Sequence, residues 1–182
     1  MIIRISGNQG SGKTTMARRL AEKLGWQFSY TGGIFREMAR EAGLAIEEFY
    51  AKMKADPELE KSIDRKQEAL MMAEDNLVVD GRLAAFQNTV FPAFNIFLKV
   101  GRLEGARRQK LRSENRHREL EEVAASTDER MANERARYKD LYGIEDHMDE
   151  SRFDYVLDTT ELDEDAVFQS CLRAVMAKIN PL

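Results

Sequence analysis

Apolar runs of four to seven residues alternate with longer amphipathic stretches along this chain of 182 residues. The runs are rich in β-branched and aromatic residues, which predicts strands at 2–6, 26–30, 76–80, 94–100 and 155–158. The longer stretches carry apolar residues at the helical period. They predict helices at 13–24, 34–42, 46–74 (with a break at Asp56-Pro57), 103–142 and 163–178, the last with Asp163 near its N-cap.

Strands separated by helices indicate right-handed β-α-β crossovers and therefore a parallel sheet. We expect an α/β fold in three layers, with a five-stranded parallel sheet in the order 2-3-1-4-5, helices on both faces and a helical lid. Ligands bind such sheets at the carboxyl ends of the strands. This places residues 7–14, 31–36, 80–82 and 158–160 on one rim.

Length and composition narrow the class of protein. A chain of 182 residues with 43% hydrophobic residues predicts a single domain, 1–182, with its own core. The net charge of −4 argues against a nucleic-acid polymer as partner. One cysteine and two histidines leave no disulfide and little for a cysteine or histidine metal site. Without an 18-residue apolar run or a leader segment, we expect a soluble, cytoplasmic protein with no membrane partner.

A glycine-rich turn follows the first predicted strand. It matches GxxxxGK[ST] in full, between a strand and a helix, which is the context in which this motif cradles phosphates. Its residues are Gly7, Asn8, Gln9, Gly10, Ser11, Gly12, Lys13 and Thr14. Backbone N–H groups and the helix N-terminus favour an anion there, and Lys13 would reach the β- and γ-phosphates. The sequence therefore predicts a nucleoside triphosphate, ATP, as ligand.

Asp80 ends the apolar run NLVVD and is the second candidate in this region. In phosphate-loop proteins an aspartate at the end of a strand supports Mg²⁺, together with the Ser/Thr hydroxyl of the loop. We therefore expect Thr14 and Asp80 to form the Mg²⁺ site. The alternative is that Asp80 only caps the following turn.

Three classes of protein share this loop. A GTPase switch needs Asn-Lys-x-Asp after a strand, and the chain has none. A mechanical ATPase usually has a larger chain and remains a minor alternative. A small phosphotransferase needs a second anion pocket and a mobile arginine segment. The sequence offers candidates for both.

Arg36 and Arg82 are the candidates for the second pocket. They follow two predicted strands, in TGGIFREMAR and DGRLAAF, with Thr31-Gly32-Gly33 read as a turn. Guanidinium groups suit phosphate oxygens, whereas the alternative for each is a surface ion pair. A phosphate monoester has its second pKa near 6 and needs no general base, so two arginines favour a nucleoside monophosphate over an alcohol. Asp64 or Asp80 could still act as a base.

Residues 103–142 are dense in charge and are the candidate lid. Arg130, Arg135 and Arg137 lie in DERMANERARYKD. Arginines delivered by lid closure would stabilise the transferring phosphoryl group. The alternative is a solvated helix with i,i+4 ion pairs.

These segments together resemble the archaeal-type cytidylate kinases, members of the nucleoside monophosphate kinases. The resemblance runs over nearly the whole chain. It is carried in order by ISGNQGSGKTTMARRLAEKLG, YTGGIFREMAREAG, EKSIDRKQ, VVDGRLAAF, ERARYKDLYGIE and YVLDTTELDEDAV. It implies transfer of the ATP γ-phosphoryl group to CMP, and usually dCMP, with Mg²⁺. It also implies acceptor-binding helices over about 31–75 and a lid over about 103–142.

The resemblance further assigns roles to individual residues. It implies that Gly7–Thr15, including Thr15, hold ATP, and that Arg36 and Arg82 hold the acceptor phosphate. Thr31 and Asp64 belong to the acceptor site, and Asp158 lies near the acceptor ribose or the lid hinge. Lys13 and the lid arginines Arg130, Arg135 and Arg137 are the implied catalytic residues.

Two positions depart from the pattern of the family. Gly33 stands where a bulkier, often acidic residue is expected, and Tyr30 stands where several bacterial members have aspartate. The residue that reads the base is therefore not identified. A kinase of UMP, another nucleotide or an alcohol stays open, as does a nucleotide-dependent binding or assembly protein. We expect a monomer or a homodimer.

Overall fold

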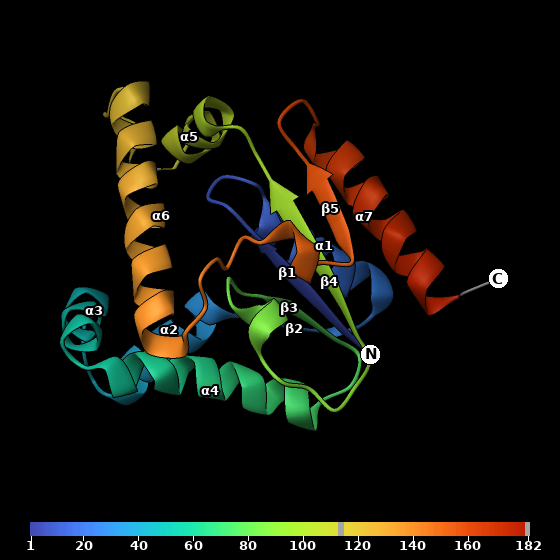
Figure 1. Cartoon of the computed structure of the whole chain (residues 1–182), viewed down its shortest axis with the longest axis horizontal. Helices are drawn as coiled ribbons and strands as arrows, with labels where there is room; N and C mark the ends of the chain where they lie inside the picture. The colour runs from blue at the N-terminus through green and yellow to red at the C-terminus, as the bar shows by residue number, and fades with distance from the viewer. Residues whose placement is uncertain (113–114, 181–182) are drawn as a thin grey trace.

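Five parallel strands form the centre of the computed structural model, which describes residues 1–112 and 115–180 (Figure 1). The strands are β1 (Ile2–Gly7), β2 (Gln27–Tyr30), β3 (Leu77–Asp80), β4 (Ala93–Lys99) and β5 (Tyr155–Asp158). Their order, β2-β3-β1-β4-β5, confirms the prediction. β1 pairs with β3 on one side and β4 on the other and is buried along its whole length.

Helices cover both faces of this sheet, as predicted. On one face α1 (Lys13–Leu24) and α7 (Glu164–Ile179) enclose the largest apolar cluster, which includes Ile3, Leu20 and Val175. On the other face α4 (Pro57–Ala73) and η1 (Ala84–Phe86) cover a smaller cluster. The Asp163 carboxylate accepts a hydrogen bond from the N–H of Ala166 at 2.7 Å, so the predicted N-cap of α7 is confirmed.

A second group of helices lies beyond the carboxyl ends of β2 and β3. It consists of α2 (Thr31–Glu41), α3 (Ile46–Ala55) and α4, which share their own apolar cluster around Ile34, Phe49 and Ile63. The break predicted at Asp56-Pro57 separates α3 from α4. There the Asp56 carboxylate accepts from the N–H of Glu58 at 3.0 Å and so caps α4.

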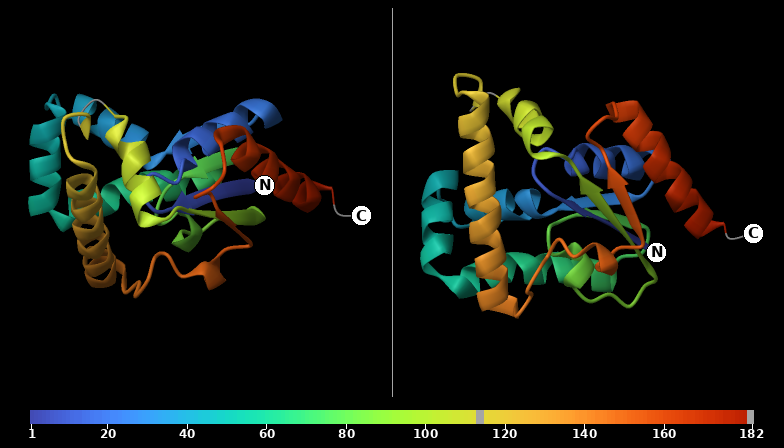
Figure 2. Two further views of the ribbon diagram at one scale, coloured as in Figure 1. Left: turned by 90° about the horizontal axis from the view of Figure 1, so that it is seen from above. Right: turned by 45° about the horizontal axis from the view of Figure 1, so that its top comes forward.

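α6 (Leu120–Tyr142) stands along one side of the molecule, opposite α7, with α3 and α5 (Arg102–Lys110) beside it (Figures 1 and 2). Its N-terminal half packs on α5 through Ala106, Val123 and Ala124. Residues 103–142 were predicted to be helical, and α5 and α6 make up most of this range as two separate helices. Ser113 and Glu114, within that stretch, lie outside the described residues.

The turn predicted at Thr31-Gly32-Gly33 was wrong, because α2 begins at Thr31. Glycine has low helix propensity, which is why the sequence favoured a turn. In the structure, the ring of Tyr30 lies against this first helical turn. A Cβ atom on Gly33 would come within 2.6 Å of the ring. Packing of the aromatic ring on the helix thus requires glycine here and offsets its poor propensity.

The remaining segment between α6 and β5 contains the short helix η3 (Glu150–Arg152). Across residues 1–112 and 115–180, no helix is both long enough and apolar enough to cross a membrane.

Candidate functional site

The phosphate loop connects β1 to α1 at the carboxyl edge of the sheet. Gly10 and Gly12 have φ angles of +81° and +87°, in the left-handed region that glycine adopts readily. Gly12 is the N-cap of α1, so the amides of the first helical turn remain available to a ligand. The Asn8 side chain bonds both the carbonyl oxygen and the N–H of Val100, at 2.8 and 3.0 Å, and so fixes the loop to the end of β4.

Lys13 lies at the mouth of this loop. Its Nζ donates a hydrogen bond to the carbonyl oxygen of Asn8 at 3.3 Å. Burial, and then the nearby charge of Arg82, lower the pKa of Lys13 to about 8. The hydroxyl of Thr14 donates a hydrogen bond to the carboxylate of Asp80, whose side chain is buried. The structure thus brings the two predicted Mg²⁺ ligands into direct contact.

A single cavity of about 780 Å³ extends from this loop to helices α2, α3 and α4. Its volume is near the upper end of the range for ligand sites. At the loop end it is lined by Gln9, Gly10, Lys13 and Thr14. At the far end its wall combines apolar side chains with two carboxylates. The lining residues there are Phe35, Tyr50, Met53, Ile63, Glu60 and Asp64.

Arg36 and Arg82 both line this cavity. Arg36, from α2, donates a hydrogen bond to the Tyr30 hydroxyl. Arg82 follows β3 directly and pairs with Glu134 of α6. Both arginines thus line the same cavity as Lys13, and Arg82 is near enough for its charge to lower the pKa of Lys13.

The floor between β3 and α4 is a small polar network. Gln67 donates to the carbonyl oxygen of Asp80 at 3.3 Å, and the Thr31 hydroxyl lies 3.4 Å from the same oxygen. Gly81 lies beside Gln67 and Thr31. A Cβ atom on Gly81 would lie 2.5 Å from Gln67 Oε1. Thr31 and Gly81 both line the cavity at this floor.

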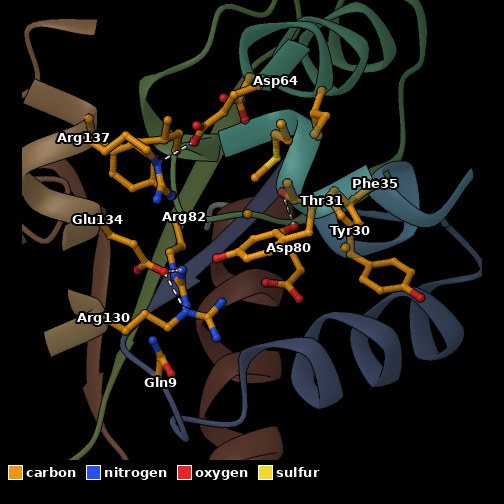
Figure 3. A pocket seen from close by; sticks show the side chains of 18 of the residues that line it. Gln9, Tyr30, Thr31, Phe35, Asp64, Asp80, Arg82, Arg130, Glu134 and Arg137 are labelled. Carbon is orange, nitrogen blue, oxygen red and sulfur yellow. Dashed lines mark hydrogen bonds and ion pairs between the residues drawn. The ribbon is translucent and has the colours of Figure 1, made fainter. Parts of the chain in front are cut away.

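Asp64, from α4, lines the far end of the cavity (Figure 3). Its carboxylate accepts a hydrogen bond from the Tyr142 hydroxyl on α6. Burial raises the pKa of Asp64 to about 6, because the charged form is poorly solvated there. Beside it, Glu60 pairs with Arg137 at 2.6 Å. Both contacts dock the C-terminal half of α6 onto α4.

α6 delivers Arg130 and Arg137 to the cavity, but not Arg135. Arg135 bonds Asp146 at 2.8 Å and the carbonyl oxygen of Glu145 at 3.2 Å, on another side of the helix. Residues 130, 134 and 137 are spaced by four and three and so share one face, whereas 135 does not. This spacing is the sequence signal that separates Arg135 from the other two.

Asp158 also lies away from the cavity. It is exposed at the end of β5, where its carboxylate accepts from the N–H of Thr160 at 2.9 Å. It therefore shapes the turn into α7. The remaining loop residues named from the motif (Gly7, Asn8, Ser11, Gly12 and Thr15) form or flank the loop without lining the cavity.

Sequence reasoning missed several groups that line the cavity: Glu60, Arg112, Glu134 and Tyr138. Glu134 is the most consequential of them. Arg130 and Glu134 stand at i and i+4, a pattern that usually marks a solvated helix face. Nothing in that pattern distinguishes such a face from one that is pressed against a cleft.

Comparison with known proteins places this site in a family. A model of the AAA domain matches residues 3–139. The cytidylate kinase of Methanopyrus kandleri is 39% identical, covering 100% of this chain and 94% of the relative. The cytidylate kinase of Thermococcus kodakarensis is 36% identical over 100% of this chain and 90% of its own. The chain belongs to the cytidylate kinase family. The resemblance stated from the sequence motifs is thereby confirmed.

Solved structures show how widely the fold of this cytidylate kinase family member is shared. The shikimate kinase of Bacteroides thetaiotaomicron superposes with a TM-score of 0.64, covering 98% of both chains at 17% sequence identity. At that identity the likeness concerns the fold alone. The family places the protein among the phosphotransferases that act on nucleotides.

Proposed function

We propose that the protein transfers the γ-phosphoryl group of ATP to the phosphate of CMP, and of dCMP, in a Mg²⁺-dependent reaction that yields ADP and CDP or dCDP. One observation carries the proposal. A single cavity joins the phosphate loop to a pocket of apolar and acidic side chains, and Arg36 and Arg82 also line it. Two anionic substrates can therefore meet end to end in one cleft.

The loop end is suited to the donor. The free amides at the start of α1 and the ammonium group of Lys13 would hold the β- and γ-phosphates. Thr14 and Asp80 present a hydroxyl and a carboxylate oxygen side by side, and oxygen ligands of this kind suit Mg²⁺, which also uses phosphate oxygens and water. When bound, Mg²⁺ would neutralise charge on the β- and γ-phosphate oxygens.

The transfer needs no general base. An oxygen of the CMP phosphate, already anionic at neutral pH, attacks the γ-phosphorus, and the bond from that phosphorus to the β–γ bridging oxygen breaks. The electron pair of that bond stays with ADP. Arg36 and Arg82 would hold the acceptor phosphate in line and offset its repulsion from ATP. Arg130 and Arg137, from α6, would face the transferring group and the acceptor.

The acceptor end supports cytosine over uracil. Asp64, with a pKa of about 6, is ionised at pH 7.5 and can only accept hydrogen bonds. Cytosine offers an exocyclic amine at the position where uracil offers a carbonyl oxygen. A carboxylate facing that position would therefore bond CMP and repel UMP, and buried polar groups of this kind discriminate strongly. Glu60, on the same helix face, supplies a second carboxylate.

A panel of acceptors in a coupled ADP-release assay tests the proposal. The panel contains CMP, dCMP, UMP, AMP, GMP and shikimate, each with ATP and Mg²⁺. We expect turnover with CMP and dCMP at least about tenfold above UMP in kcat/KM, the size of one lost hydrogen bond. Turnover with shikimate alone would replace the proposal by an alcohol kinase. ATP hydrolysis unaffected by any acceptor would indicate a nucleotide-dependent binding protein.

A further inference from the structure

Glu134 is a buried carboxylate in the middle of the cations of the cavity. Its side chain is only 4% exposed, although it lines the cavity. One of its oxygens, Oε1, accepts from both Arg82 Nη1 and Arg130 Nε, the latter at 3.0 Å. Figure 3 shows the two arginines converging on this carboxylate from different parts of the chain, Arg82 from the segment after β3 and Arg130 from α6.

The way each arginine is held leaves most of its donors free. A guanidinium group carries five N–H bonds, and Glu134 uses one from each arginine. Because Arg130 is bound through Nε, its two terminal nitrogens extend beyond the contact toward the cavity (Figure 3). Those terminal nitrogens form the planar fork that binds phosphate oxygens in pairs.

Stability alone does not account for this arrangement. A buried carboxylate carries a large desolvation penalty, which ion pairs only roughly offset. The second oxygen of Glu134, Oε2, is buried and has no hydrogen-bond partner within residues 1–112 and 115–180. A well-packed apolar residue would satisfy this position better. The carboxylate is better explained by what it does to the two arginines.

The Glu134 carboxylate also affects the electrostatics of the cavity. Lys13 and Arg82 are close enough that the charge of Arg82 lowers the pKa of Lys13, and Arg130 adds a third cation. Without an anion between them, the two guanidinium groups would repel each other and Arg130, 62% exposed, would turn to solvent. Glu134 Oε1 accepts hydrogen bonds both from Arg82, which follows β3, and from Arg130 of α6. The orientation of Arg82 thereby depends on α6 being docked.

We propose that Glu134 is a positioning residue for phosphoryl transfer: it holds the guanidinium groups of Arg82 and Arg130 so that their free N–H groups converge on the phosphoryl group in front of Lys13. The inference rests on the phosphotransfer proposed above. In this role Glu134 acts through the two arginines rather than through a contact of its own with the substrates. It links docking of α6 to the assembly of the arginine pair.

Steady-state kinetics of Glu134→Gln, Glu134→Asp and a control test the inference. Glutamine keeps the shape but loses the charge that holds two guanidinium groups. We expect kcat with the best acceptor to fall about 100-fold, as misplaced groups typically cause, while the Kd of a non-hydrolysable ATP analogue changes less than threefold. Glu134→Asp restores the charge on a shorter side chain. We expect its kcat to be at least tenfold higher than that of Glu134→Gln.

Asp140→Asn is the matched control, because Asp140 is an exposed carboxylate on the same helix. We expect wild-type kinetics for it. All rates are referred to folded protein, determined by circular dichroism, so that loss of fold is not counted as loss of catalysis. An unchanged kcat in folded Glu134→Gln would overturn the inference. So would a lower acceptor KM at unchanged kcat, because Glu134 would then only compete with the acceptor phosphate for the arginines.

A binding measurement keeps this inference separate from the proposed function. ADP with aluminium fluoride and Mg²⁺ imitates the transferring phosphoryl group and requires no turnover. We expect calorimetry to show about 100-fold weaker binding for Glu134→Gln than for the wild type. If the wild type transfers phosphoryl to no monophosphate, the proposed function fails, and this measurement still decides the role of Glu134. Equal binding by wild type and variant would refute that role.

Discussion

Gly10 of the phosphate loop packs directly against Gly105 of α5. A Cβ atom on Gly10 would lie 2.4 Å from the carbonyl oxygen of Gly105, and one on Gly105 would lie 2.9 Å from the carbonyl oxygen of Gln9. Backbone meets backbone at this contact, so no side chain can rotate away. The first helix of the predicted lid is therefore seated on the phosphate loop, the proposed site of the triphosphate.

Gly105→Ala should displace the phosphate loop. The added methyl group meets the backbone of Gln9 and the Val100 side chain, at 2.9 and 3.1 Å, so the loop or α5 must shift. We expect kcat/KM for ATP to fall about 10- to 100-fold, because small displacements of bound phosphates are costly. Arg107→Ala, at an exposed position of the same helix, is the control. Unchanged ATP kinetics in Gly105→Ala would show that the backbone at the contact between Gly10 and Gly105 can shift without affecting the use of ATP.

Gly32 and Gly33 provide a matched pair at the start of α2. Alanine at either position should improve helix propensity by up to about 1 kcal/mol. At Gly33 the methyl group would press on the Tyr30 ring, 2.6 Å away, whereas at Gly32 the nearest ring atom is at an ordinary 3.6 Å. Tyr30 bonds Arg36, so Gly33→Ala should disturb this arginine, which we propose binds the acceptor phosphate.

We therefore expect the acceptor KM to rise about tenfold in Gly33→Ala and to change less than threefold in Gly32→Ala, in the coupled assay. The ATP KM should be unaffected in both. Equal acceptor KM values in the two variants would mean that the Tyr30 ring does not support Arg36. Glycine at position 33, where the family pattern has a bulkier residue, leaves room for the ring of Tyr30, a relationship visible only in the folded chain.

Some of the site follows from sequence and some does not, and the difference is physical. The phosphate loop, Asp80 and Arg82 are local to strand ends, and parallel strands bring their carboxyl ends to one rim. Glu134 and Tyr142 depend instead on how α6 docks against α4 and β3. That docking is set by contacts between residues 52 to 78 positions apart in the chain, which no local pattern encodes.

Arg36→Ala should weaken the acceptor and spare the donor. Arg36 lines the cavity and is contributed by α2 rather than by the loop. Loss of a charge-assisted hydrogen bond to phosphate should lower kcat/KM for CMP by about 2–3 kcal/mol, or roughly 30- to 150-fold. The Kd of an ATP analogue, measured by calorimetry, should stay within threefold. A parallel loss of ATP affinity would assign Arg36 to the donor site.

Asp64 should make stability depend on pH. Its pKa rises from the ordinary 3.8 to about 6 in the folded protein. Between these values the folded state keeps a proton that the unfolded state releases, so stability from this group is present below pH 4 and is lost as pH rises to 6. The full loss amounts to about 3 kcal/mol at most.

Urea unfolding at pH 4.5 and 7.5 measures this effect. Asp64→Asn cannot ionise and still accepts from Tyr142, so its stability should fall less than that of the wild type between these pH values. Asp140→Asn, exposed on α6, should follow the wild type. Parallel behaviour of wild type and Asp64→Asn would mean that the Asp64 carboxylate is well solvated.

Lys13 should make ATP binding weaken above pH 8. Burial and the charge of Arg82 lower its pKa to about 8 in the free protein, so the ammonium group that attracts the triphosphate is progressively lost above that pH. Bound phosphates favour the charged form, and binding must then take up a proton. We expect the Kd of an ATP analogue to rise about tenfold by pH 9, measured by calorimetry in buffers of different ionisation enthalpy.

Lys13→Arg stays charged throughout this range, so its affinity, even if lower, should not vary between pH 7 and 9. An equally flat profile for the wild type would show that Lys13 is fully protonated before the nucleotide arrives.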